Sequence, residues 1–225
     1  MQTLRSTPGL GAWKMDLGDY NMPYLYVLTF VLKLPFSPLY MIKLFSVVFD
    51  FILAYYAMRL SSLVVKSPMK QLAVYVVVLF LPTVVVNSAY WAQCDAVYAA
   101  LALGGLYYGL SKRPRLCVVF FALAFSFKIQ TVFLLPILLV LYFVKKIKRS
   151  HLVWFPGVFL LGLVPALLAG KPFMDTILIY VRQASQYPRL TLNAPSVYQF
   201  LNGNSDFALF NTAGIMLTGA AVLAV

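Results

Sequence analysis

Long apolar runs separated by short clusters of lysine and arginine constrain this chain more than any other feature. The chain is 62% hydrophobic and only 11% charged, whereas about a quarter of the residues of soluble domains are charged. A helix needs roughly 20 apolar residues to cross a bilayer. The sequence therefore predicts an all-α, polytopic bundle of transmembrane helices. Its apolar runs are residues 38–65, 72–86, 96–110, 116–144, 152–169 and 207–225.

The basic clusters predict how the runs are oriented. Short loops rich in lysine and arginine lie in the cytoplasm, so each interval between clusters crosses the membrane an even number of times. Residues 72–110 then cross twice, turning at residues 87–95. Residues 116–144 also cross twice, turning near residues 126–130; one long tilted helix would put two basic clusters on opposite sides. The clusters are Arg59, Lys66 and Lys70; Lys112, Arg113 and Arg115; and Lys145, Lys146, Lys148 and Arg149.

This orientation divides the chain into one membrane domain with four parts. Residues 1–37 form an outer loop and a short interfacial helix, residues 38–169 the transmembrane bundle, residues 170–206 an outer loop, and residues 207–225 a final span. Residues 1–21 would lie outside with nothing upstream to carry them across the membrane. We therefore expect the chain to be a fragment that lacks a first transmembrane helix and later helices.

The charge balance and the cysteines limit the partners. The net charge of +12 follows from the basic clusters, which face anionic headgroups, so membrane lipids are expected as partners and nucleic acid is not. The two cysteines and one histidine form no zinc motif. No nucleotide-binding glycine motif is present. No metal site is predicted, although Asp16 and Asp19 are carboxylates of the kind that hold a divalent cation.

Residues 87–95 are the strongest candidate site. Polar groups at membrane depth are costly and usually line a cavity or a site. Trp91 offers a flat face for a sugar ring, and Asn87, Gln93 and Asp95 offer hydrogen bonds to its hydroxyls. Asp95 is also suited to the first turn of a helix, which is the purely structural alternative. Asp50, the one carboxylate inside a span, is interpreted as a buried partner in bundle packing.

Cationic residues supply the second part of the predicted site. Lys128, with Gln130 beside it, lies within an apolar run, where a lipid phosphate is the natural counter-ion; the alternative is a lysine that reaches out to the interface. Arg182 and Arg189 lie in a loop with interleaved aromatic residues, and a guanidinium binds phosphate in a forked geometry. Asp19 is suited to act as a general base, although its surroundings also favour an ordinary turn.

The chain resembles the GT-C superfamily of integral-membrane glycosyltransferases. It is most similar to bacterial proteins related to the second mannosyltransferase of GPI-anchor synthesis. The Phe-Lys-x-Gln pattern also resembles the endoplasmic-reticulum glucosyltransferases that extend dolichol-linked oligosaccharides. The matching stretches are GDYNMPYLY (18–26), LYMIKLFSVVFD (39–50), NSAYWAQCD (87–95), RPR (113–115), FSFKIQTVFLLP (125–136) and QYPRLTLNAPSVYQF (186–200).

The resemblance implies a GT-C-like fold and transfer of a mannose-like hexose, with inversion, from a polyprenyl-phosphate donor. The acceptor would be a lipid-linked or cell-surface glycan on the outer face of a bacterial cell membrane. The family's catalytic acid is expected upstream of Gly18, before the chain begins, so Asp19 is its substitute and Asp95 the second candidate. Two alternatives stay open: a transporter or flippase of lipid-linked sugars, and a non-catalytic membrane subunit.

Overall fold

The computed structural model describes residues 11–14, 20–185, 190–191, 197–201 and 206–224. Helices are the only regular secondary structure among the described residues, which include no strand. They form two compact units, residues 1–177 and 178–225. Unit 1 holds η1 (Gly11–Lys14), α2 (Met22–Leu32), α3 (Pro38–Ser61), α4 (Pro68–Leu79), α5 (Pro82–Val85), η2 (Val86–Tyr90), α6 (Asp95–Leu110), α7 (Pro114–Phe127), η3 (Ile129–Leu134), α8 (Pro136–Phe143), α9 (Arg149–Leu152), α10 (Trp154–Leu168) and α11 (Phe173–Ile177). Unit 2 holds α12 (Ile179–Ser185), η4 (Val197–Phe200) and α13 (Phe207–Ala224).

Three stretches of helix among the described residues are long and apolar enough to cross a membrane. They are α3, the α9–α10 stretch Arg149–Leu168, and α13. A fourth candidate is broken: α4 and the stretch Pro82–Tyr90 pass the same test together but are bent by 44°. These helices bear out the prediction of an all-α chain with membrane-spanning helices, as expected of an integral membrane protein.

Prolines begin many of these helices where the sequence changes character. Proline occupies the first turn of α3, α4, α5, α7 and α8, where its missing N–H removes no helical hydrogen bond.

The apolar run 116–144 is broken at Lys128, which has an extended backbone with φ −151° and ψ 130°. The helix is thus broken within residues 126–130, as predicted, but the helical stretches on either side, Pro114–Phe127 and Ile129–Phe143, are each shorter than a full membrane span, so the two predicted crossings stay a prediction.

The centre of unit 1 is formed by α6, which packs between α3 and α7. Glycines on α6 allow this close approach. A Cβ atom added at Gly105 would lie 2.8 Å from the Phe121 ring, and one added at Gly109 would lie 3.0 Å from Cys117 Sγ. Phe121 and Cys117 of α7 are themselves fully buried. Small residues at such contacts allow helix backbones to come close, as is common in membrane proteins.

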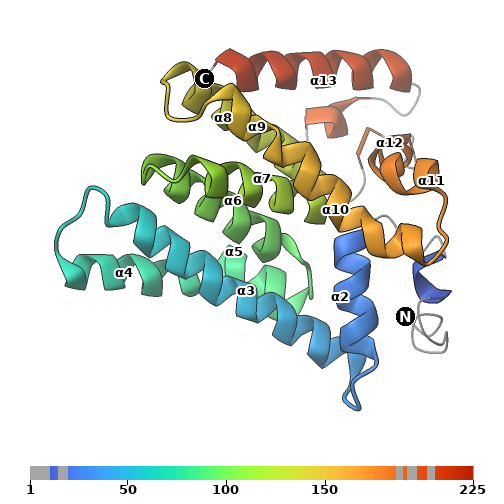
Figure 1. The fold of residues 1–225 in the computed structure, drawn as a ribbon, viewed down its shortest axis with the longest axis horizontal. Coiled ribbons are helices and arrows are strands. Elements are labelled where there is room, and N and C mark those ends of the chain that lie inside the picture. Colours follow the sequence, from blue (N-terminus) through green and yellow to red (C-terminus); the bar gives the residue numbers. More distant parts are fainter. Residues whose placement is uncertain (1–10, 15–19, 186–189, 192–196, 202–205, 225) are drawn as a thin grey trace. The chain divides into compact units, whose positions relative to one another are not determined.

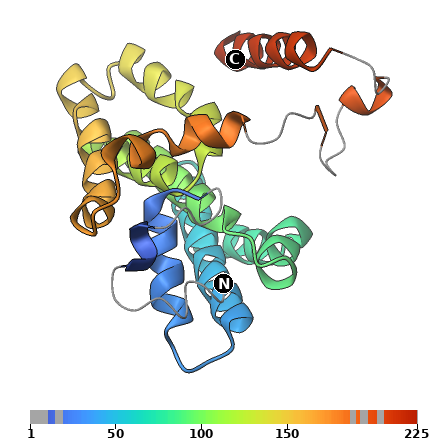
Figure 2. The same ribbon diagram turned by 90° about the vertical axis from the view of Figure 1, so that its right-hand side faces the viewer.

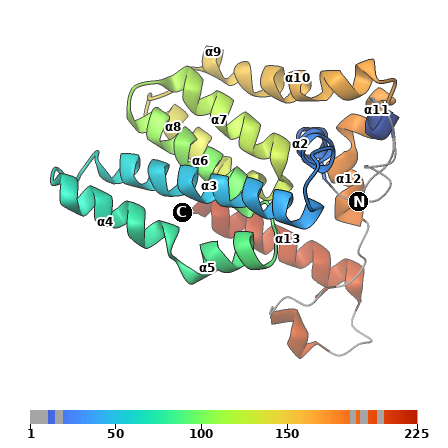
Figure 3. The same cartoon turned by 90° about the horizontal axis from the view of Figure 1, so that it is seen from below.

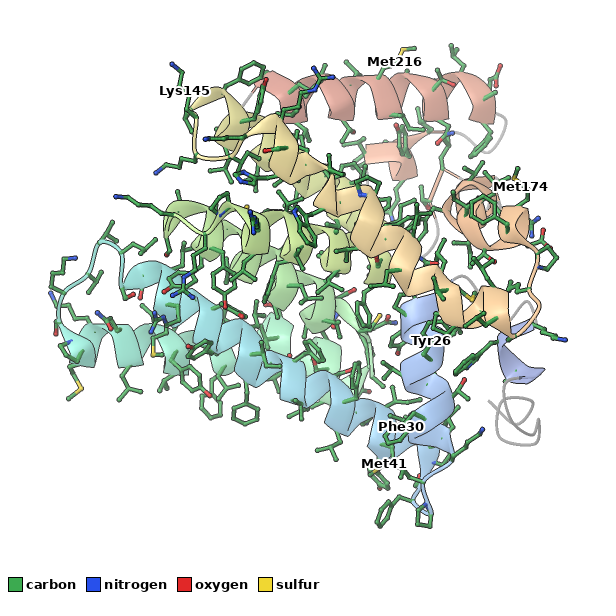
Figure 4. The ribbon with its side chains drawn as sticks, in the orientation of Figure 1. Tyr26, Phe30, Met41, Lys145, Met174 and Met216 are labelled. Carbon is green, nitrogen blue, oxygen red and sulfur yellow. The ribbon has the colours of Figure 1, made fainter. Side chains whose placement is uncertain are left out.

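The three basic turns of unit 1 lie at one end of it. The α3–α4, α6–α7 and α8–α9 connections all lie toward the left in Figures 1 and 3, and Lys145 marks the last of them in Figure 4. Phe30 and Met41, beside the α2–α3 turn, lie at the other end. The structure thus places the basic clusters together, as their predicted common side of the membrane requires.

The short helix α2 packs beside α3 and α10 (Figure 2). Pro165 lies inside α10 and has no backbone N–H, so it removes one hydrogen bond from the helix, as proline does in any helix interior. The Tyr26 hydroxyl, labelled in Figure 4, accepts a hydrogen bond from the Ala166 amide at 2.9 Å. A tyrosine of α2 therefore satisfies a backbone group of the proline-containing turn, which fixes α2 against α10.

Candidate functional site

An ion pair joins the two parts of the predicted site within unit 1. Lys128, at the end of α7, pairs with Asp95, the first residue of α6. The Asn87 amide donates a hydrogen bond from Nδ2 to the second carboxylate oxygen of Asp95 at 2.8 Å. The Lys128 ammonium also lies 5.8 Å from the centre of the Tyr98 ring, within the range of a cation–π contact. Three predicted site residues, two from the stretch 87–95 and one from the stretch around Lys128, thus form one network.

Local backbone geometry explains how Asn87 reaches Asp95. Residues Val86–Tyr90 form a single π-helical turn, a feature that is frequent at functional sites. Ala92 then adopts a left-handed conformation, with φ 57°, which reverses the chain direction. The backbone N–H of Gln93 donates a hydrogen bond to the backbone carbonyl of Asn87 at 3.0 Å and closes this turn. The polar stretch is therefore a compact, hydrogen-bonded turn that leads directly into α6.

The helices that carry the network are shorter than a full membrane span. Counted from the basic turn that joins them, α6 extends for 16 residues and α7 for 14. At 1.5 Å per residue these helices are about 24 Å and about 21 Å long, whereas the hydrocarbon core is about 30 Å thick. The ion pair thus lies at the ends of two short helices, opposite their shared basic turn.

A cavity of about 160 Å³ adjoins the network. Asp95 and Asn87 line one part of it, and Asp50 and Ser88 line another. The Ser88 hydroxyl donates to Asp50 Oδ1 at 2.7 Å. The full lining is Asp50, Leu53, Thr83, Val84, Asn87, Ser88, Asp95, Ala96, Tyr98 and Ala99. The lining residues include two carboxylates, a carboxamide and three hydroxyls, but most of the cavity surface is apolar and the fully buried Ser88 hydroxyl is already bonded to Asp50.

Asp50, Thr83 and Tyr98 lie outside the predicted site, and Ser88 lies within the predicted stretch 87–95 but was not singled out. The expectation that Asp50 is buried and partnered is confirmed, since it is 4% exposed and bonded to Ser88. Its position on the cavity wall was not foreseen. The signal in the sequence is only partial: a lone carboxylate in an apolar span requires a polar partner, but several polar stretches lie nearer to Asp50 in the chain than residues 87–95.

The other predicted site residues lie elsewhere. Trp91 is 65% exposed and does not line the cavity, and Gln93 beside it does not either. Gln130 is exposed on η3. Arg182 lies on α12 in unit 2. Asp19 and Arg189 fall outside the residues that the structure describes.

The donor atoms of the network fit an anion or a hydroxyl-bearing ligand. Among the described residues, no three of the histidines, cysteines and carboxylates come together as a metal site would require. Lys128 is 16% and Asp95 36% exposed in their side chains, so a ligand can reach both. An arriving phosphate would compete with Asp95 for the same ammonium group.

No family model, no curated protein and no solved structure matches this chain.

Proposed function

We propose that the protein is an integral-membrane glycosyltransferase with a GT-C-like bundle. It would transfer a mannose-like hexose from a polyprenyl-phosphate donor to a lipid-linked or cell-surface acceptor on the outer face of a bacterial membrane. The observation that carries the proposal is the Asn87–Asp95–Lys128 network. It borders a cavity to whose lining Asp95 and Asn87 contribute, and it lies at the ends of α6 and α7 opposite their shared basic turn.

Lys128 supplies the cationic half of the proposed chemistry. In the free protein its ammonium group is held by Asp95. When the donor binds, its phosphate takes over the ammonium, because charge-assisted hydrogen bonds to phosphate are strong. The positive charge then stabilises the lipid phosphate as it leaves with the electron pair of its bond to the sugar.

Asp95 supplies the anionic half. Released from Lys128, its carboxylate is still oriented by the Asn87 amide. An acceptor hydroxyl oxygen attacks the anomeric carbon as the bond to phosphate breaks, and its proton passes to a carboxylate acting as general base. Asp95 is the candidate base among the described residues, and Asp19 remains the predicted alternative.

The test measures sugar transfer from a radiolabelled polyprenyl-phosphate hexose by membranes that contain the full-length protein. Asp95→Asn should lower kcat by about 10² or more, the usual contribution of a general base. Lys128→Met should raise KM for the donor and also lower kcat, because the ammonium both binds the phosphate and stabilises it as it leaves. Lys70→Met, which removes an exposed lysine at the start of α4, is the matched control and should leave both constants unchanged.

Unchanged transfer in Asp95→Asn and Lys128→Met would contradict the proposal. If the protein instead moved the donor lipid between leaflets, vesicles would show donor translocation that depends on Lys128 and no transfer product. If the protein were a non-catalytic subunit, neither transfer nor translocation would respond to these substitutions.

A further inference from the structure

Asp50 is a buried carboxylate that the proposed chemistry does not use. It lies near the middle of α3, twelve residues after Pro38 and eleven before Ser61. Asp50 is 4% exposed. Ser88, whose hydroxyl donates a hydrogen bond to Asp50 at 2.7 Å, is fully buried. A carboxylate in a membrane span is expensive, and an apolar residue would pack there at lower cost. The carboxylate adds one thing that an apolar residue lacks, a directional hydrogen-bond acceptor.

The Asp50 carboxylate holds the π-helical turn η2, which carries Asn87. Ser88 follows Asn87 directly in the π-helical turn η2, and η2 packs against α3. This turn ends the bent stretch Pro82–Tyr90, which is separated from α4 by the break at Phe80 and Leu81. A hydrogen bond to a rigid neighbouring helix is therefore well placed to fix the turn. Through it, Asp50 is linked to Asn87 and, by the next hydrogen bond, to Asp95.

We propose that Asp50 is a positioning residue. Its hydrogen bond with Ser88 fixes the π-helical turn, so that the Asn87 amide is aimed at Asp95 and the Asp95–Lys128 pair is held at the cavity. This inference goes beyond the proposed function, because it concerns the geometry of the turn and holds whatever ligand the cavity takes. Its test therefore has a readout that is independent of sugar transfer.

Cys94 is a native probe of this turn. It directly precedes Asp95 and is 1% exposed, so an alkylating reagent reaches its thiol only when the structure around it, which includes the turn and Tyr24 of α2, opens locally. Cys117, the other cysteine, is fully buried in the core of α7 with Val118, Phe121 and Ala124. Its alkylation reports loosening of the bundle as a whole. The experiment follows N-ethylmaleimide modification of both cysteines in the solubilised full-length protein by peptide mass spectrometry.

Ser88→Ala removes the hydroxyl without adding atoms, and Asp50→Leu removes the acceptor. Losing this one hydrogen bond should raise the modification rate of Cys94 by about tenfold, with little change at Cys117. Asp50→Asn keeps an acceptor oxygen and should restore the slow rate. Ser46→Ala is the matched control, because Ser46 lies one turn earlier on α3 and its buried hydroxyl has no hydrogen-bond partner.

Three results would overturn the proposal. The first is a Cys94 rate in Ser88→Ala that stays within twofold of the parent protein. The second is an equal rise at Cys94 and Cys117, which would show that the whole bundle loosens. The third is an Asp50→Asn rate as high as that of Ser88→Ala, which would assign the effect to charge. Because Ser88→Ala is a minimal change, the test stands even where Asp50→Leu fails to fold. Sugar transfer can be absent in every variant without affecting this readout.

Discussion

At the scale of single residues, the Asp95–Lys128 pair determines what the candidate site can do. Lys128 is the more buried partner, with 16% of its side chain exposed against 36% for Asp95. Removing Asp95 leaves a largely buried ammonium without its counter-ion, whereas removing Lys128 leaves a carboxylate that still accepts a hydrogen bond from Asn87. Removing Asp95 should therefore cost more stability than removing Lys128, and each removal changes the surroundings of the remaining charged group.

A double-mutant cycle separates structural from functional roles of this pair. Asp95→Asn should destabilise the protein more than Lys128→Met. Each substitution should lower the free energy of unfolding by about 1–3 kcal/mol, a range between the values for exposed ion pairs and for buried ones. The double variant should lose less stability than the sum, because no unpaired charge remains. Thermal unfolding in detergent measures stability, and sugar transfer is measured alongside. A double variant that regains both stability and transfer would show that the pair is only structural.

The polar residues of the network could be predicted from the sequence, whereas the contacts around them could not. Asn87, Asp95 and Lys128 could be singled out because each is polar where the chain is otherwise apolar. The bond between Asp50 and Ser88 could not be read from the chain, because it joins positions 38 residues apart and depends on how α3 packs against η2. The exposure of Trp91, at 65%, was not predicted either.

At the scale of elements, glycines on α6 set how closely the helices of unit 1 approach. Hydropathy predicted the apolar segment 96–110 and proline positions agree with several helix starts, but neither shows which face of α6 is crowded. The structure does: a Cβ atom at Gly105 would lie 2.8 Å from the Phe121 ring and 3.2 Å from the Cys117 carbonyl oxygen. That oxygen belongs to the backbone of α7, so it cannot turn aside as a side chain can.

Alanine at Gly105 should therefore force α6 and α7 apart. We expect Gly105→Ala to lower the free energy of unfolding by about 1–3 kcal/mol, the usual cost of overpacking. Gly157→Ala is the matched control, because nothing lies within 4 Å of a Cβ atom there. In α10 this substitution should instead stabilise the helix by about 0.5–1 kcal/mol. Thermal unfolding of both variants gives the comparison, and equal shifts in the same direction would refute the crowding argument.

At the scale of the whole molecule, the arrangement within unit 1 matters most. The basic turns lie together (Figure 1), and the ion pair lies at the other ends of α6 and α7. The positions of the lysine and arginine clusters predicted that the basic turns share one side. They did not predict where α6 and α7 end and η2 begins, which sets the place of the ion pair in unit 1.

The measurement that tests this account most directly is the sidedness of two introduced cysteines. Trp91→Cys probes the exposed turn beside the site, and Lys112→Cys probes an exposed position of a basic turn. Both native cysteines are buried, so the parent protein gives the background. In sealed vesicles, a membrane-impermeant thiol reagent should label these positions from opposite sides, with Lys112→Cys reached from the cytoplasmic side. Labelling of both from the same side would contradict the proposed topology and, with it, a transferase site facing away from the cytoplasm.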